Sequence, residues 1–292
     1  MHRYSIKFGQ FYITNVCNLT CGDCASFNNL PLKGHFNWHS NKDVVAQWSK
    51  IVDIEEINIL GGEPFLNGDL DNWVVGIRHN WPECKNLKIT TGINDFRLLT
   101  YKDSIRRWNK LNVGIEISIH DPNVWDQVDS YIQEILELEC DVLEGTYTET
   151  AFPEKFKTYM HNGIVLFALK QSWKFAPSAI KEIRDGIIIM HDNDSSKAHK
   201  SCLWSDCHYF VEGRFYKCVV AAAAPELVKQ KRIDENSREL IMATEYATPT
   251  SDNLDSYFSN LHRPIPQCSL CPVNVIDNII PIFPLASKKH KV

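Results

Sequence analysis

The sequence has no excess of basic residues, no long apolar run and no export signal. Its 31 Lys and Arg residues are outnumbered by 36 Asp and Glu residues, which gives a formal net charge of −5 and no general attraction for polyanions. No stretch approaches the roughly 20 consecutive apolar residues of a membrane-spanning helix, and Met1 to Gln10 lack the basic region and apolar run of a signal peptide. We therefore expect a cytoplasmic protein with no nucleic-acid partner and no membrane partner.

Cysteine, in contrast, is abundant. The chain has ten cysteines, and disulfides rarely persist in a reducing compartment, so we expect metal ligation or redox chemistry. With 292 residues, of which 44% are hydrophobic, the chain is long enough to form an α/β core and a small second domain.

Three of the cysteines, Cys17, Cys21 and Cys24, have the spacing Cys-x3-Cys-x2-Cys directly after an apolar segment. Three thiolates on so short a loop can bind one face of a 4Fe–4S cluster, and the fourth iron is then open to an exogenous molecule. The alternatives are buried free thiols or a zinc knuckle, although structural zinc takes a fourth protein ligand and typically uses paired Cys-x2-Cys units.

A second motif, Gly61-Gly62-Glu63-Pro64, follows the apolar segment 57–60. Glycines at this point allow the backbone to approach a ligand closely, and proline fixes the exit of the turn. Alone, the motif is also compatible with an ordinary strand-to-helix turn. Its position, one expected strand and one expected helix after the cysteine loop, makes it a stronger indication of a functional site.

With these two motifs the chain resembles the radical S-adenosylmethionine (radical SAM) enzymes. The resemblance implies that Cys17, Cys21 and Cys24 hold a 4Fe–4S cluster whose open iron is chelated by the methionine moiety of S-adenosylmethionine. It implies reductive cleavage of this cofactor to a 5′-deoxyadenosyl radical, hydrogen-atom abstraction from a substrate, and a reducing partner such as flavodoxin or ferredoxin. The implied cofactor-binding residues are Gly61, Gly62, Glu63, Pro64, Thr91, Ser118 and His120.

Three of these residues lie at the ends of two expected strands, where each also has a structural interpretation. Thr91 ends one strand, and Ser118 and His120 end the next, so their side chains can meet the ribose and carboxylate of the cofactor. A hydroxyl at a strand end more commonly caps a helix or closes a turn, and Asp121-Pro122 is a typical helix start.

The chain departs from the family at Asp23, since the position before the third cysteine is often aromatic and near the adenine. Phe27, or Phe11 and Tyr12 on the preceding strand, can supply an apolar wall for the adenine instead. Each of these three residues is equally compatible with a place in the core.

The hydrophobic periodicity alternates between the strand and helix patterns through residues 1–195, which predicts βαβ units. Following the resemblance, we expect an α/β fold with a partial (β/α)6 barrel of the triose-phosphate-isomerase (TIM) type and ligands at the C-terminal ends of its strands. The expected strands are 11–16, 56–60, 87–91, 113–119, 143–148 and 163–169. The expected helices are 41–52, 70–79, 102–108, 122–138, 154–159 and 178–184.

The remaining residues, 196–292, carry five further cysteines. A turn at Glu212-Gly213 predicts a hairpin that brings Cys202 toward Cys218, and the pair Cys268 and Cys271 can complete a four-thiolate site. This spacing resembles the Twitch module, a shortened relative of the SPASM module, and implies a small domain with an auxiliary 4Fe–4S cluster. A closed four-cysteine site formed by a hairpin and a Cys-x2-Cys pair is also typical of zinc ribbons, which bind zinc instead.

Three cysteines lie outside both sets. We expect Cys84 and Cys140 to be buried as small hydrophobic residues. Cys207, five residues after Cys202, is expected to be buried too, with a role as an alternative ligand or a thiol donor as the other possibility.

The resemblance implies a radical SAM enzyme that oxidises or modifies its substrate with help from the auxiliary cluster. We expect a small molecule, such as a sugar or antibiotic-type precursor, because a separate peptide-recognition domain of roughly eighty residues has no room beside a barrel and a Twitch module. One alternative is a peptide-modifying maturase. Another is a non-enzymatic iron–sulfur or zinc protein in electron transfer or assembly, although such a protein has no need of Gly61 to Pro64.

Overall fold

The computed structural model describes residues 4–93, 97–147, 154–171, 174–175, 178–273 and 280–281. Its main feature is a nine-stranded sheet with the order β12-β11-β1-β2-β3-β4-β7-β6-β5. The six central strands, from β11 to β7 in this order, are parallel to one another. The outer strands β12, β6 and β5 pair with their neighbours in antiparallel fashion. The bounds of these strands are Tyr4–Tyr12 (β1), Val52–Leu60 (β2), Asn86–Thr91 (β3), Val113–Ile119 (β4), Asp141–Tyr147 (β5), Glu154–His161 (β6), Ile164–Gln171 (β7), Cys207–Val211 (β11) and Arg214–Tyr216 (β12).

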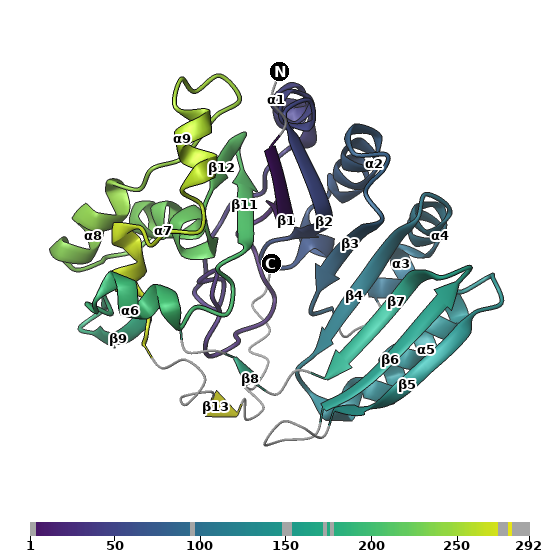
Figure 1. The fold of residues 1–292 in the computed structure, drawn as a ribbon. Coiled ribbons are helices and arrows are strands. Elements are labelled where there is room, and N and C mark those ends of the chain that lie inside the picture. Colours follow the sequence, from purple (N-terminus) through teal and green to yellow (C-terminus); the bar gives the residue numbers. More distant parts are fainter. Residues whose placement is uncertain are drawn as a thin grey trace.

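The helices that follow β1 to β4 cover one face of this sheet, and a second group of helices gathers beside β11 and β12 (Figure 1). Apolar residues alternate along the strands, as in Ile115, Ile117 and Ile119 of β4, and pack against the helices in one large core. The helices are Trp38–Ser49 (α1), Leu70–Asn80 (α2), Arg97–Thr100 (α3), Lys102–Lys110 (α4), Trp125–Ile135 (α5), Ser195–Lys200 (α6), Val219–Gln230 (α7), Glu235–Met242 (α8) and Leu254–Ser259 (α9), with short 3-10 turns at Pro64–Leu66 (η1), Pro122–Val124 (η2) and Pro266–Leu270 (η3).

The first four strand–helix units agree with the sequence prediction, with one shift. The first strand covers Tyr4–Tyr12 instead of 11–16, because Ser5 and Lys7 alternate with apolar residues and conceal its start. The predicted strand 113–119 has the same bounds as β4, and the predicted helix 122–138 is a 3-10 turn followed by α5.

Two predicted helices, at 154–159 and 178–184, are wrong. Residues 154–161 form β6, which pairs with β5 and β7, and Ile180–Arg184 form β9, which pairs with β10 (Ile187–Met190). The decisive residues are the dipeptides Asn162-Gly163 and Asp185-Gly186, all four with positive φ between 51° and 76°. Such turns match the twist of a two-stranded hairpin. The predicted strands 143–148 and 163–169 are present as β5 and β7, and antiparallel strands take the place of the two predicted helices. A further small sheet pairs β8 (Lys174–Phe175) with β13 (Ile280–Pro281).

The hairpin predicted around Glu212-Gly213 is present as β11 and β12, with φ of 49° and 76° at these two residues. The sequence did not indicate that β11 lies parallel to β1, with Phe8 opposite Cys207. Residues on both sides of position 195 thus share one continuous sheet. The described part of the chain contains no helix that is long and apolar enough to cross a membrane.

Candidate functional site

The cysteine loop and the Gly-Gly-Glu-Pro motif contact each other at the C-terminal ends of β1 and β2. The amide of Gly62 donates to the carbonyl of Thr14 at 2.7 Å, and the amide of Glu63 donates to the carbonyl of Val16 at 2.8 Å. A Cβ on Gly62 would lie 2.3 Å from the Val16 carbonyl oxygen, and one on Gly61 would lie 2.5 Å from the Thr14 oxygen. The two glycines are therefore needed for the approach of the cysteine loop itself.

Glu63 is fully buried behind this loop. Its Oε1 accepts hydrogen bonds from the amide of Phe65 at 3.0 Å and the hydroxyl of Thr91 at 2.7 Å, and its Oε2 accepts one from the amide of Gly92 at 3.0 Å. Burial raises the pKa of Glu63, and these hydrogen bonds partly offset that effect. Glu63 thus caps the turn η1, which Pro64 begins.

The other predicted cofactor residues lie along the same edge. Thr91 is buried, and its hydroxyl also accepts a hydrogen bond from the amide of Ile93 at 2.9 Å. The hydroxyl thus acts as both donor and acceptor within the protein. A Cβ on Gly92 would lie 2.7 Å from Leu19 of the cysteine loop and 3.9 Å from the ring of His120. Ser118 lies on β4 opposite Lys170 of β7. The cysteine loop therefore rests on the ends of β2 and β3, with His120 beside Gly92.

The thiols of Cys17, Cys21 and Cys24 are close enough to influence one another. Burial raises the pKa of each, and the neighbouring thiols add to this effect on Cys17 and Cys21. The pKa of Cys21 rises to about 12. The Glu63 carboxylate raises the pKa of Cys17 as well. In opposition, the amide of Leu19 donates to Cys17 Sγ at 3.4 Å, and hydrogen bonds from four backbone amides between 26 and 29 favour the thiolate of Cys24. Amides directed at cysteine sulfur are a feature that suits an iron–sulfur cluster.

Asp23, the position at which the chain departs from the family, has a structural role. Its Oδ1 accepts a hydrogen bond from the amide of Ser178 at 3.1 Å, which ties the cysteine loop to the β9–β10 region. The three aromatic candidates for an adenine wall are core residues: Phe27 and Phe11 are buried, and the hydroxyl of the buried Tyr12 contacts the amide side chain of Asn28.

The second set of cysteines comes together from three separate segments. Cys202 follows α6, Cys218 precedes α7, and Cys268 and Cys271 belong to or follow η3. Burial raises the pKa of all four thiols, and the mutual influence of the other thiols raises those of Cys202, Cys218 and Cys271 further. The amide of Ile265 donates to Cys268 Sγ at 3.5 Å. The four predicted ligands are thus neighbours in space.

No group of three or more His, Cys, Asp or Glu side chains within the described ranges converges on one point in the way that a single metal ion requires. A 4Fe–4S cluster makes a different demand, because each thiolate binds a different iron and the ligands surround the cluster. Neighbouring thiols that do not meet at one point are compatible with that arrangement in both cysteine sets.

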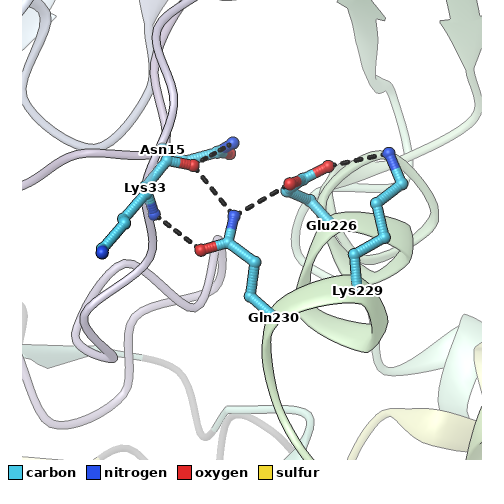
Figure 2. Close-up of polar contacts among 5 residues, drawn as sticks. All are labelled: Asn15, Lys33, Glu226, Lys229 and Gln230. Atoms are coloured by element: carbon cyan, nitrogen blue, oxygen red, sulfur yellow. Dashed lines mark hydrogen bonds and ion pairs between the residues drawn. The ribbon is translucent and has the colours of Figure 1, made fainter.

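The two cysteine sets are packed against each other through α7. Phe27 and Leu32, which follow the cysteine loop, share a hydrophobic cluster with Val219 and Leu227 of α7, and Cys218 and Cys271 pack on the same cluster. Polar contacts reinforce this packing. The side chain of Gln230 on α7 accepts from the amide of Lys33 at 2.8 Å and donates to its carbonyl at 2.9 Å (Figure 2).

The cysteines outside both sets differ from one another. Cys84 is buried, as predicted, whereas Cys140 is only partly buried and its Sγ donates to the Leu138 carbonyl at 3.3 Å; the prediction of a buried Cys140 is therefore wrong. Cys207, at the start of β11, is also only partly buried, so the prediction of its burial is wrong as well. Burial, followed by the charges of Asp206 and Cys202, raises the pKa of Cys207 to about 11.

Sequence reasoning missed a charged group on the sheet face that points away from α2 and α4. Glu116 Oε2 accepts from the ammonium groups of Lys88 at 2.8 Å and Lys170 at 3.1 Å. Burial alone would raise the pKa of Glu116, but the two lysines outweigh it and hold this pKa below its usual range. All three residues line a cavity of about 740 Å³ that begins at the N-terminal ends of β3, β4 and β7. Nearby on β2, opposite Lys88, Asn58 Oδ1 is buried and has no hydrogen-bond partner within the described ranges.

Comparisons with known proteins give weak likenesses only. The structure of BtrN in complex with AdoMet and 2-DOIA aligns with 96% of this chain and 100% of its own, at 15% identity and a TM-score of 0.46. The structure of Streptococcus suis SuiB bound to S-adenosylmethionine aligns with 46% of this chain and 39% of its own, at 15% identity and a TM-score of 0.28. The aligned part therefore spans well under half the length of SuiB. No protein-family model and no curated protein matches the sequence.

Proposed function

We propose that this chain is a radical SAM enzyme that binds a 4Fe–4S cluster through Cys17, Cys21 and Cys24. The observation that carries the proposal is the contact between the cysteine loop and Gly61 to Glu63 at the C-terminal edge of a parallel sheet. This edge is where ligands bind in α/β sheets. When bound, the cluster supplies one electron that cleaves a carbon–sulfur bond of S-adenosylmethionine, and the 5′-deoxyadenosyl group takes a hydrogen atom from the substrate.

The residues of the chain have distinct tasks in this proposal. Backbone amides stabilise the thiolates of Cys17 and Cys24, which favours the ligating form. Glu63 holds the cysteine loop against β3, and its Oε2 is proposed to accept a hydrogen bond from the cofactor ammonium. Gly61, Gly62 and Pro64 shape the turn, and Thr91 fixes Glu63. Ser118 and His120, at the end of β4, are proposed to contact the cofactor directly.

We propose a small polar molecule as the substrate. The sheet face next to Ser118 carries the paired Glu116 and Lys170, and Asn58 Oδ1 of β2 has no partner among the described residues. A polar substrate such as a sugar derivative can make hydrogen bonds to these groups. An apolar face would be expected for a hydrophobic substrate. A peptide substrate remains the second candidate, since polar side chains of a peptide can make the same contacts.

The proposal includes an auxiliary 4Fe–4S cluster at Cys202, Cys218, Cys268 and Cys271, in a Twitch-like region of residues 196–292 that follows a barrel region of residues 1–195. Such a cluster can accept an electron from the product radical, which makes the overall reaction a two-electron oxidation, or anchor the substrate. A flavodoxin or ferredoxin is proposed as the electron donor, in a cytoplasmic setting.

The test is cleavage of S-adenosylmethionine by anaerobically reconstituted protein in the presence of dithionite. We expect 5′-deoxyadenosine from the wild type, none from Cys17→Ala, Cys21→Ala or Cys24→Ala, and an unchanged amount from Cys140→Ala, a cysteine outside both sets. Metal binding without 5′-deoxyadenosine formation in the wild type would overturn the proposal and favour a non-enzymatic iron–sulfur or zinc protein.

A further inference from the structure

Lys217 is an unusual lysine, because its side chain is buried next to the second set of cysteines. The residue is only 4% exposed, and its Nζ has no hydrogen-bond partner among the residues that the structure describes. A lysine is rarely fully buried unless it is paired, because transfer of an isolated ammonium from water into a protein interior is costly. The position therefore requires an explanation other than packing.

The surroundings of Lys217 indicate what the missing partner is. Lys217 directly precedes Cys218, and its ammonium lies within electrostatic reach of Cys268, Cys218 and Cys202, three of the four predicted ligands, although burial lowers the pKa of Lys217 overall. His199, on α6, carries a second buried atom, Nε2, that has no partner in the described part of the chain, and it lies within the electrostatic reach of Lys217. His208 Nδ1 contacts the Lys217 carbonyl at 2.8 Å and helps to fix the backbone of this residue.

We infer that Lys217 is the counter-charge of an anionic metal–thiolate group held by Cys202, Cys218, Cys268 and Cys271. The inference rests on the proposed C-terminal metal site. It adds that Lys217 influences the reduction potential of a cluster bound there, or the release of a bound zinc ion. Four thiolates outweigh the positive charge of a 4Fe–4S core and of a zinc ion alike, so either group is a net anion. A buried ammonium beside it then gains a partner, and the anion gains a positive charge in a region of low dielectric constant.

For a 4Fe–4S cluster, this arrangement has a consequence for electron transfer. Reduction adds one negative charge, and a nearby positive charge stabilises the reduced form more than the oxidised form. Lys217 therefore raises the reduction potential of the auxiliary cluster and makes it a better electron acceptor. For zinc, which has no redox chemistry, the same charge would instead slow the loss of the metal.

The experiment uses the full-length loaded protein and three substitutions. Lys217→Met removes the charge at similar size, Lys217→Arg keeps the charge, and Lys200→Met removes a lysine that is exposed and two residues before Cys202. Lys217→Gln serves as a second neutral variant if Lys217→Met does not fold. Iron, sulfide and zinc contents identify the occupant, and redox titration followed by electron paramagnetic resonance gives the potential of each cluster.

With iron and sulfide in the second site, the neutral variants should shift its reduction equilibrium at least tenfold toward the oxidised form, which is a fall of about 59 mV for one electron. Lys217→Arg and Lys200→Met should leave it near the wild-type value, and the first cluster should be unchanged. With zinc, the neutral variants should lose the metal to a chelator at least tenfold faster than Lys200→Met.

Two results would overturn the inference, and they are distinguishable. A wild-type protein whose four C-terminal cysteines hold no metal refutes the auxiliary site and the inference with it. A wild-type protein that holds the metal, together with neutral Lys217 variants that change neither its potential nor its release, refutes the role of Lys217 alone and leaves the proposed function intact.

Discussion

The hydroxyl of Thr91 donates a hydrogen bond of 2.7 Å to Oε1 of Glu63, and so joins the ends of β3 and β2 beneath the cysteine loop. Both residues were predicted to contact the cofactor. The Thr91 hydroxyl has no further hydrogen to offer, because its only hydrogen is donated to Glu63, and its oxygen also accepts from the amide of Ile93. Thr91 is best understood as a positioning residue that holds the buried Glu63 carboxylate in one orientation.

Replacement of Glu63 by Gln tests both roles of this carboxylate. The variant retains one acceptor oxygen but places an amide NH2 against a donor that Glu63 now satisfies, so we expect a loss of about 1–3 kcal/mol in the free energy of unfolding. If Oε2 also binds the cofactor ammonium, the affinity for S-adenosylmethionine should fall about ten- to a hundredfold. Titration of the cofactor into reconstituted protein, followed by electron paramagnetic resonance, measures this affinity. Lower stability with unchanged affinity would mean that Glu63 only caps η1.

The glycine motif can be tested by a single methyl group. In Gly62→Ala the new Cβ would lie 2.3 Å from the Val16 carbonyl oxygen and 3.0 Å from Cys17 Cβ, so the cysteine loop must move. We expect reconstituted Gly62→Ala to lose most of the iron of the first cluster. Gly68→Ala is the matched control, because a Cβ there has no neighbour within 4 Å. Equal iron contents in the two variants would argue against the close approach of the cysteine loop to Gly62.

The sequence predicted the elements that depend on local pattern and missed those that depend on distant contacts. Four strand–helix units were recognisable from their periodicity, and the hairpins at Asn162-Gly163 and Asp185-Gly186 carried a turn signal that was overlooked. The place of β11 beside β1 was not available from local pattern. It depends on contacts such as the stacking of Phe11 on Phe210, with ring centroids 4.7 Å apart, from segments almost two hundred residues apart.

The same distinction holds at the site. The cysteine spacings and the Gly-Gly-Glu-Pro motif are local, and the structure brings each set together. The bond between Glu63 and Thr91 depends on the register of β2 and β3, and the bond from Ser178 to Asp23 joins segments that the sequence gives no reason to pair. Lys217 was not recognised because a lysine before a cysteine is unremarkable until its burial is known.

The ion pairs of Glu116 predict a specific dependence of stability on pH. Because its folded pKa is lowered from a usual value near 4.5, Glu116 stabilises the folded state above the unfolded pKa, and this contribution disappears as the pH falls through the folded pKa. We expect Glu116→Gln to be about 1–2 kcal/mol less stable than wild type above pH 5, with a difference that narrows in more acidic solution. Anaerobic urea titrations at several pH values measure this difference. Glu182→Gln, which breaks an exposed ion pair with Arg184, should change stability little, and a Glu116→Gln deficit that is independent of pH would contradict the assigned cause.

The last prediction separates the two cysteine sets by metal content and by activity. Wild type should carry about eight irons with matching sulfide, and the variant with Ala at Cys202, Cys218, Cys268 and Cys271 should carry about four. With dithionite, Cys268→Ala should still cleave S-adenosylmethionine, because the Cys17 loop and its contacts with Gly62 do not involve Cys268, but it should form little product if the auxiliary cluster accepts the product electron. 5′-Deoxyadenosine and product are measured in the same incubation. Equal loss of both in a folded Cys268→Ala protein would show that the second site supports the first through the shared packing of α7, since Phe27 and Cys218 lie in the same hydrophobic cluster.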